Sequence, residues 1–257
     1  MRDDSYERGI KPMKVAERLI VAADYDPRKE GGVSGVREKV LKLGDDLEGL
    51  GVIIKVNSIL RAMGFSLISD LHDAGLKIMA DLKLIDIPNT MKMDGTMLAE
   101  YKPELVTVMC CAGIEGMSQV QKAMGDTTEI LGVTILTSLD EEECQAIFTC
   151  STKAGVLRFA RMGQLAGLQG LVSSPQEAEM LAAKTEIVLA ANTPGIRPAW
   201  SLVAEDDQQR VMTPGKAIEA GVKRIVVGRP ITQAVSPREA TERTLEEIEE
   251  ALIEERG

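Results

Sequence analysis

Three ionisable side chains of opposite charge lie close together in the segment DLKLIDIPNT, residues 81–90. The apolar run GLKIMA before it is typical of a buried strand. Strand side chains alternate between faces, so Asp81 and Lys83 are predicted to point the same way. Asp86 follows the end of this strand, because Pro88 disfavours its continuation. Two carboxylates and an ammonium group that converge where a strand meets its loop are typical of a site that binds charge or moves a proton. The alternative is a solvated loop with a chance salt bridge, which contributes little to stability.

The elements that must position this segment form a regular alternation of strands and helices. Apolar runs of strand length recur along the chain, and apolar residues at helical spacing lie between them. The expected strands are residues 18–23, 51–54, 75–80, 105–109, 129–136, 168–173, 186–190 and 224–227. The expected helices are 36–47, 60–71, 90–101, 117–124, 141–166 with a break near 151, and stretches that begin at 175, 213 and 236.

This eightfold alternation predicts the α/β class and a single (β/α)8 TIM barrel over residues 1–257, with residues 1–16 as a polar lead-in. A chain of 257 residues with 44% hydrophobic content is long enough for one such core. Ser236, Pro237 and Glu239 have the spacing of a capping box at the start of the last helix.

In barrels of this kind the active site lies at the carboxyl ends of the strands. For any single polar residue at a predicted strand end, an ordinary solvated loop residue is the alternative. Several such residues nevertheless fall at these ends: Asp24, Lys55, Asp81, Lys83, Thr137 and Arg229. In the alternating set Lys55, Asp81, Lys83 and Asp86, each opposite neighbour favours the charged form. Such an array suits the stabilisation or destabilisation of charge on a substrate, with Lys83 as a proton donor.

Three stretches in the last third of the sequence are typical of a phosphate grip. The loop NTPGIRP supplies Gly195 and Arg197, Gln208 precedes a helix start, and Gly228 and Arg229 follow the eighth strand. Barrel enzymes often bind phosphate after strands seven and eight, and arginine suits phosphate through bidentate hydrogen bonds. For each Gly-Arg pair alone, a tight turn is the alternative.

Composition excludes several other classes. The net charge of −10 without a basic patch disfavours nucleic acid as a partner, and the longest apolar runs are far too short to span a membrane. The charged N-terminus has no apolar signal-peptide core, so a cytoplasmic location is expected. His72 is the only histidine and is predicted on a helix surface, which argues against a histidine base. The four cysteines lack zinc-site spacing and are expected to be reduced thiols.

With these residues assembled, the chain resembles the orotidine 5′-phosphate decarboxylases of the bacterial-type branch, from Leu19 to about Val235. The motifs that carry the resemblance are ADLKLIDIPNT, LTS at 136–138, TPGIRP at 193–198, DQQRVMTP at 207–214 and VVGRPIT at 226–232. It implies decarboxylation of orotidine 5′-phosphate to uridine 5′-phosphate in pyrimidine synthesis, with neither a metal nor an organic cofactor.

The resemblance also implies residue roles. Lys55, Asp81, Lys83 and Asp86 would form a charged catalytic tetrad, in which Asp81 lies beside the substrate carboxylate and Lys83 protonates carbon 6 of the pyrimidine. Asp86 and Thr90 would reach into the neighbouring site of a homodimer. The implied substrate contacts are Asp24 to the ribose, Thr137 with Ser138 nearby to the base, and Arg197, Gln208, Gly228 and Arg229 to the phosphate, with residues 197–208 closing as a lid.

Two departures and two alternatives accompany this resemblance. Met109 stands where many relatives carry the His of a His-Ala pair, and the stretch 193–210 is a little longer than in close relatives. One alternative is a magnesium-dependent sugar-phosphate decarboxylase or synthase of the same barrel superfamily, although Lys55 stands where a metal would favour a carboxylate. The other is a non-catalytic nucleotide-phosphate binder, for which packing two lysines against two aspartates would be costly.

Overall fold

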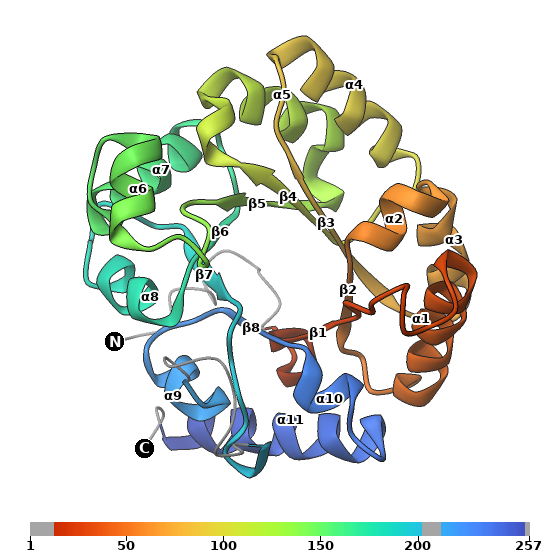
Figure 1. Ribbon diagram of the computed structural model, residues 1–257. Coiled ribbons are helices and arrows are strands. Elements are labelled where there is room, and N and C mark those ends of the chain that lie inside the picture. The colour runs from red at the N-terminus through yellow and green to blue at the C-terminus, as the bar shows by residue number, and fades with distance from the viewer. Residues whose placement is uncertain (1–12, 202–211, 255–257) are drawn as a thin grey trace.

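A computed structural model describes residues 13–201 and 212–254 and contains a closed barrel of eight parallel strands in sequence order (Figure 1). β8 pairs with β1, with Ile225 opposite Leu19, and this pairing closes the barrel. The predicted (β/α)8 fold is therefore confirmed. The strands are β1 (Leu19–Ala22), β2 (Ile53–Val56), β3 (Lys77–Leu84), β4 (Leu105–Met109), β5 (Glu129–Val133), β6 (Gly170–Val172), β7 (Ala190–Thr193) and β8 (Arg224–Val227).

Helices surround the barrel on its outside (Figure 1). The α-helices are α1 (Val33–Leu47), α2 (Ser58–Met63), α3 (Ser66–Asp73), α4 (Pro88–Ala99), α5 (Ile114–Met124), α6 (Glu141–Phe148), α7 (Thr152–Leu165), α8 (Pro175–Ala182), α9 (Pro214–Glu219), α10 (Arg229–Thr232) and α11 (Pro237–Glu254). Short 3-10 turns are η2 (Val15–Arg18), η3 (Cys110–Ala112), η4 (Gly125–Thr127) and η5 (Ala199–Ser201). None of the helices in the described ranges is long and apolar enough to cross a membrane.

The alternation of strand side chains divides the core into two parts. Inside the barrel, Ile20, Ile53 and Leu131 pack with their neighbours, whereas Val21 and Ile54 belong to the larger cluster between strands and helices. Each fully buried side chain of this size contributes about 1.5–3 kcal/mol. Both layers fix the strands rigidly, so their carboxyl ends can hold polar groups in place.

The seventh strand lies later in the sequence than predicted. β7 begins at Ala190, and the apolar residues before it form a loop in which Val188 is 79% exposed. The side chain of Gln164 on α7 holds this loop: it accepts from the Val188 N–H (2.9 Å) and donates to the Glu186 carbonyl (3.0 Å). These bonds satisfy the backbone groups that a strand ladder would have used.

Smaller differences occur at other element ends. The predicted helix over 60–71 is two helices, α2 and α3, because the chain turns at Gly64 with a φ of 82°. β5 ends at Val133 rather than at 136. The expected break near Ser151 is confirmed, since this residue caps α7 by accepting from the Ala154 N–H. At α11 one half of the expected capping box is present, in which the Glu239 N–H donates to Ser236 Oγ.

Candidate active site

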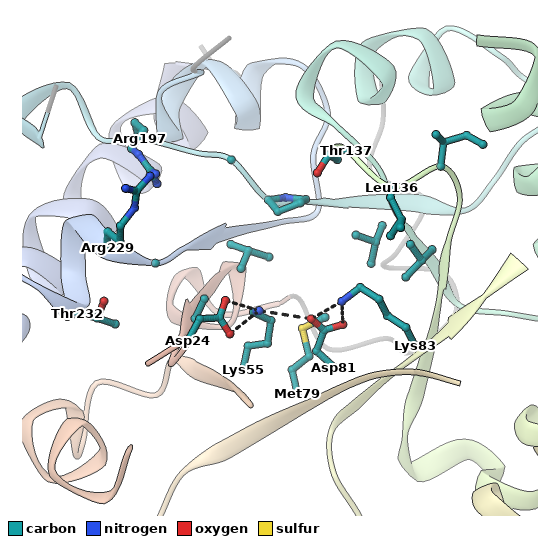
Figure 2. Close-up of a pocket in the computed structure, with 18 residues that line it drawn as sticks. Asp24, Lys55, Met79, Asp81, Lys83, Leu136, Thr137, Arg197, Arg229 and Thr232 are labelled. Carbon is teal, nitrogen blue, oxygen red and sulfur yellow. Dashed lines mark hydrogen bonds and ion pairs between the residues drawn. The ribbon is translucent and has the colours of Figure 1, made fainter. Parts of the chain in front are cut away.

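A cavity of about 480 Å³ opens at the carboxyl ends of the strands (Figure 2). It lies where barrel enzymes carry their active sites. Its wall includes the predicted residues Asp24, Lys55, Asp81, Lys83, Thr137, Arg197, Gly228 and Arg229. The structure thus brings together side chains from segments that are far apart in the sequence.

A continuous chain of charges crosses one side of this cavity (Figure 2). Lys55 Nζ on β2 lies 2.8 Å from Asp24 Oδ2 and 3.4 Å from Asp81 Oδ2. Lys83 Nζ lies 2.7 Å from the same Asp81 oxygen and 2.8 Å from the other. Asp81 therefore lies between two ammonium groups, and Lys55 lies between two carboxylates.

Asp81 is almost fully enclosed, with 5% of its surface exposed. Burial by itself raises the pKa of this carboxyl, but Lys55, Lys83 and the Thr107 hydroxyl act against it and hold the pKa below the usual value. The group is therefore a carboxylate at neutral pH. A fixed negative charge in a poorly solvated wall can act strongly on a neighbouring substrate charge.

β3 does not run as a regular ladder past these residues. Ala80 pairs with Val106 and Leu84 pairs with Val108, so four steps along β3 match two steps along β4. Lys83 within this bulge has a φ of 49°, which costs a non-glycine residue on the order of 1–3 kcal/mol. Asp81 and Lys83 do meet, as predicted, but on a bulged strand rather than on one with simple alternation.

Two arginines occupy the other end of the cavity, away from Lys83 (Figure 2). Arg197 is buried, and its backbone N–H donates to the Met212 carbonyl (3.0 Å), which fixes the end of the NTPGIRP loop. Arg229 is the first residue of α10, directly after Gly228. Two guanidinium groups at one end of a cavity suit a phosphate dianion.

The sequence pattern did not predict the apolar part of the wall or two threonines. Apolar side chains at strand ends look like ordinary core, so only the closed barrel identifies those that face the cavity: Met79, Val133, Ile135, Leu136, Val172 and Val226. Thr232 on α10 also lines the cavity, and Thr107 on β4 contacts Asp81 from behind. The strand pattern at 105–109 marked Thr107 only as one polar residue in an apolar strand.

Among the described residues, three predicted site residues are not in the cavity wall. Asp86 is exposed in the turn after β3, where its carboxylate accepts from the Ile87 N–H (2.7 Å). Thr90 lies in the first turn of α4, and Ser138 is exposed beyond Thr137. Gln208 lies outside the described residues.

The described part of the chain contains no group of side chains suited to hold a metal ion. Within residues 13–201 and 212–254, no three His, Cys, Asp or Glu side chains are grouped so that they could hold a metal ion. The ammonium group of Lys55 instead lies between the carboxylates of Asp24 and Asp81, where a cation would compete with it. His72 lies on α3, with Nε2 3.3 Å from Glu104, away from the cavity.

A closed barrel with a charged cavity at the carboxyl ends of its strands defines a (β/α)8-barrel enzyme. Comparison with known proteins narrows the class. The profile of the orotidine 5′-phosphate decarboxylase / HUMPS family matches residues 17–244. The orotidine 5′-phosphate decarboxylase of Heliobacterium modesticaldum is 36% identical over 254 residues, which cover 93% of this chain and 99% of that protein.

Two further relatives agree. The orotidine 5′-phosphate decarboxylase of Pseudomonas putida is 38% identical over 237 residues, which cover 90% of this chain and 96% of that protein. The crystal structure of the Lactobacillus acidophilus enzyme of the same name has a TM-score of 0.74 at 30% identity, with 90% of this chain and 99% of that chain covered. The chain therefore belongs to the orotidine 5′-phosphate decarboxylase / HUMPS family.

Proposed function

We propose that this protein converts orotidine 5′-phosphate to uridine 5′-phosphate and carbon dioxide in pyrimidine biosynthesis, without a metal or organic cofactor. One observation carries the proposal: a single cavity has a Lys83–Asp81–Lys55–Asp24 charge chain on one side and two arginines at its far end. A nucleotide with a carboxylate on its base and a phosphate on its ribose fits this cavity. Its phosphate would lie against the two arginines, and its carboxylate would lie at the charge chain that contains Lys83 and Asp81.

The arginine end would hold the 5′-phosphate. Arg197 and Arg229 can each offer a pair of N–H groups to phosphate oxygens, and the backbone at Gly228 lies beside them in the wall. Gln208 completes the predicted phosphate set. Asp24 would accept from the ribose hydroxyls, and Thr137, with Ser138 next in the loop, would contact the base.

The reacting carboxylate would then lie beside Asp81. Repulsion between the two carboxylates is relieved when the bond between carbon 6 and the carboxylate carbon breaks, the electron pair stays on carbon 6 and carbon dioxide leaves. The Lys83 ammonium group stabilises the developing negative charge and transfers a proton to carbon 6, after which the neutral amine regains a proton from water. Lys55 would hold Asp81 and Asp24 in place.

Binding at the far end supports this chemistry. Interactions with a phosphate that does not react can stabilise the transition state by fixing the base against Asp81 and Lys83. The apolar wall residues limit water around the reacting carbon, and this strengthens each charge interaction there.

The position of Lys55 supports metal independence. A magnesium ion bound by Asp24 and Asp81 would have to displace an ammonium group that already lies within 3.4 Å of both. The rival function in the same superfamily, a magnesium-dependent sugar-phosphate decarboxylase or synthase, requires that displacement.

We further propose that the active unit is a homodimer in which Asp86 and Thr90 complete the neighbouring site. The support is a group of apolar side chains around the β3–α4 turn that are exposed in the single chain: Ile85 (57%), Ile87 (66%), Met93 (45%) and Met97 (56%). Apolar side chains gathered in this way are typical of an interface. A cytoplasmic location is part of the same proposal and is supported by the family's role in nucleotide synthesis.

The test is an absorbance assay with orotidine 5′-phosphate, with a chelator present and no added metal. Loss of substrate absorbance together with formation of uridine 5′-phosphate is expected. Turnover that appears only after magnesium is added would contradict metal independence. Binding of uridine 5′-phosphate without any turnover of the substrate would instead identify a non-catalytic binder.

A further inference from the structure

Thr107 connects the two residues on which proton transfer depends. Its side chain lies on β4, fully buried, outside the cavity wall and behind Asp81. The Thr107 hydroxyl donates to Asp81 Oδ1 (2.9 Å) and accepts from the backbone N–H of Lys83 (2.9 Å). One oxygen atom thus contacts the carboxylate and the main chain of the lysine that lies against it.

The bulge in β3 explains why a hydroxyl is needed there. In a regular parallel ladder, a strand N–H donates to a backbone carbonyl of the neighbouring strand. At the bulge the register between β3 and β4 shifts, and the Lys83 N–H donates to the Thr107 side chain instead. A buried N–H without a partner would be destabilising, so the hydroxyl takes the place of the missing ladder bond.

The direction of the two bonds is fixed by chemistry. A hydroxyl has one proton to donate, and a backbone N–H can only donate. Since the hydroxyl accepts from Lys83, its own proton is left for Asp81, which must accept it. The bond is therefore charge-assisted and orients the carboxylate.

We propose that Thr107 is a positioning residue that holds the Asp81 carboxylate and the left-handed backbone of Lys83 in the arrangement required for proton transfer. This inference rests on the proposed decarboxylase function. Thr107 does not touch the substrate; it acts through Asp81 and Lys83.

The decisive variant is Thr107→Val, which keeps the branched shape and removes the hydroxyl. We expect kcat to fall about 10- to 100-fold, the range for one charge-assisted hydrogen bond. The dissociation constant of uridine 5′-phosphate should change less than about threefold, because Arg197 and Arg229 hold the phosphate independently. Thr107→Ser, which keeps the hydroxyl, should recover most of the activity.

Thr128→Val is the matched control. Thr128 is another buried threonine, and its hydroxyl donates to the Pro103 carbonyl (2.7 Å) before β5, away from the cavity. Its loss should reduce stability and leave kcat unchanged. A merely structural role for Thr107 predicts that the two valine variants behave alike.

A second readout does not require turnover. The groups that face Asp81 are Lys55 from β2, Lys83 from β3 and the Thr107 hydroxyl from β4. Loss of the hydroxyl should raise the pKa of Asp81, and this is measurable from the ¹³C shift of its carboxyl carbon, assigned with Asp81→Asn. Because the reaction needs the carboxylate, the acid limb of kcat/KM should move to higher pH in Thr107→Val.

Two results would overturn the inference: normal kcat with an unshifted Asp81 titration in folded Thr107→Val, or equal loss of activity in the valine and serine variants. An inactive wild-type enzyme would instead refute the proposed function, and the Asp81 titration would still test the contact.

Discussion

Lys83 carries the proton in the proposed reaction, and its side chain ends in the cavity with 34% of its surface exposed. Lys83→Ala removes this proton donor without opening a hole in the core, and alanine tolerates the left-handed backbone about as well as lysine. We expect turnover to fall by about 10²–10⁴-fold or more, the usual contribution of a general acid, with normal folding. Decay of substrate absorbance and thermal unfolding measure the two effects.

The control is Lys77→Ala at the other end of the same strand, where the lysine pairs with Glu17 at 2.5 Å. It removes an equal charge and should keep normal turnover. Near-normal turnover in Lys83→Ala would show that another group delivers the proton.

Arg229 is expected to affect binding rather than the chemical step. It lies at the far end of the cavity from Lys83 (Figure 2), so Arg229→Ala should raise the dissociation constant of uridine 5′-phosphate. Loss of charge-assisted bonds to phosphate predicts weakening of about 10- to 100-fold. Calorimetric titration with the nucleotide measures it. Arg238→Ala is the control and should bind normally, because this arginine lies on α11 and donates to the Glu48 carbonyl at the end of α1. Unchanged affinity in Arg229→Ala would place the phosphate elsewhere.

At the scale of elements, the segment just after the NTPGIRP loop contacts α11. The guanidinium carbon of Arg243 lies 4.6 Å from the ring centre of Trp200 in η5, shortly after Arg197. Arg243→Gln should lower the free energy of unfolding by about 0.5–1 kcal/mol, the value for an exposed cation–π contact, and shift the fluorescence of the protein's only tryptophan. Denaturation followed by this fluorescence is the measurement. Arg243→Lys keeps the cation and should lose less; equal loss in both variants would argue against the contact.

The sequence was sufficient to predict the eight-stranded barrel, because eight apolar runs separated by helical spacing match only a few folds. It was not sufficient to place β7. The apolar residues 187–189 have strand composition, but Gln164 on α7 holds this segment as a loop through bonds to Glu186 and Val188. A contact between distant segments overrides local propensity here.

The candidate site shows the same limit. Charged residues at several strand ends predicted the cavity, because the active sites of such barrels lie at the carboxyl ends of the strands. The bulge at Asp81–Lys83 and its threonine could not be predicted, since register between two strands depends on both sequences at once. Asp86 and Thr90 lie outside the cavity of a single chain, and their predicted role depends on a second copy.

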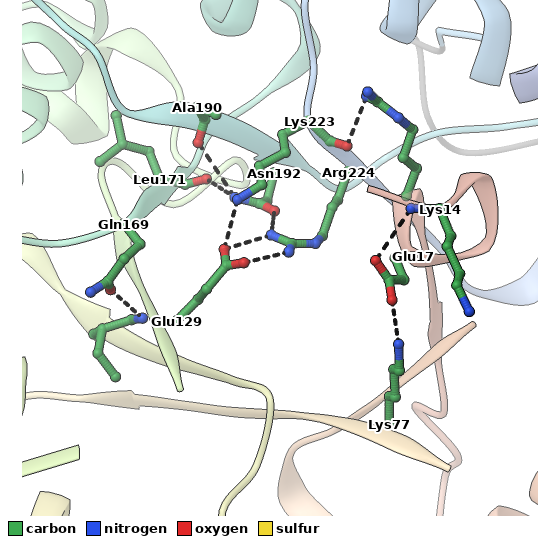
Figure 3. Close-up of polar contacts among 12 residues, drawn as sticks. Lys14, Glu17, Lys77, Glu129, Gln169, Leu171, Ala190, Asn192, Lys223 and Arg224 are labelled. Atoms are coloured by element: carbon green, nitrogen blue, oxygen red, sulfur yellow. Dashed lines mark hydrogen bonds and ion pairs between the residues drawn. The ribbon is translucent and has the colours of Figure 1, made fainter. Parts of the chain in front are cut away.

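At the scale of the whole molecule, a partly buried ion network lies at the amino-terminal end of the barrel (Figure 3). Glu129 on β5 binds Arg224 on β8 through both oxygens (2.7 and 2.8 Å) and Lys223 at 2.8 Å. Burial alone would raise the pKa of Glu129, but these two cations lower it to about 2. In barrels this end is associated with stability rather than chemistry.

The lowered pKa gives a stability change with a defined sign. The contribution of Glu129 is complete above about pH 4.5, its ordinary pKa, and is lost as the pH falls toward 2. Above pH 5, Glu129→Gln should therefore be less stable than the wild type by on the order of 2–3 kcal/mol, and the difference should shrink in acid. Urea unfolding between pH 3 and 7 measures this. Glu186→Gln breaks an exposed ion pair with Arg161 and should show a much smaller difference. A stability difference between Glu129→Gln and the wild type that does not change with pH would contradict the lowered pKa of Glu129.

A shared active site predicts complementation between inactive variants. If Asp86 serves the partner's cavity, a heterodimer of Lys83→Ala and Asp86→Ala contains one cavity with both residues intact. Mixing and reassociating the two variants should restore up to about a quarter of wild-type activity, from half of the dimers with one good site each. Sedimentation would confirm the dimers. Dimeric mixtures without any recovered activity would show that Asp86 acts within its own chain.

The bulge in β3 also sets stability and activity in opposition during evolution. Deletion of the two extra residues between Ala80 and Leu84 would restore a regular ladder to β4 and remove an unfavourable backbone angle. Selection for folding alone would favour that flatter strand. If Lys83 delivers the proton, selection for activity keeps the irregular strand, because the deleted pair would have to include Asp81 or Lys83 itself. In a descendant released from catalysis, this segment is where we expect drift toward regular structure to begin.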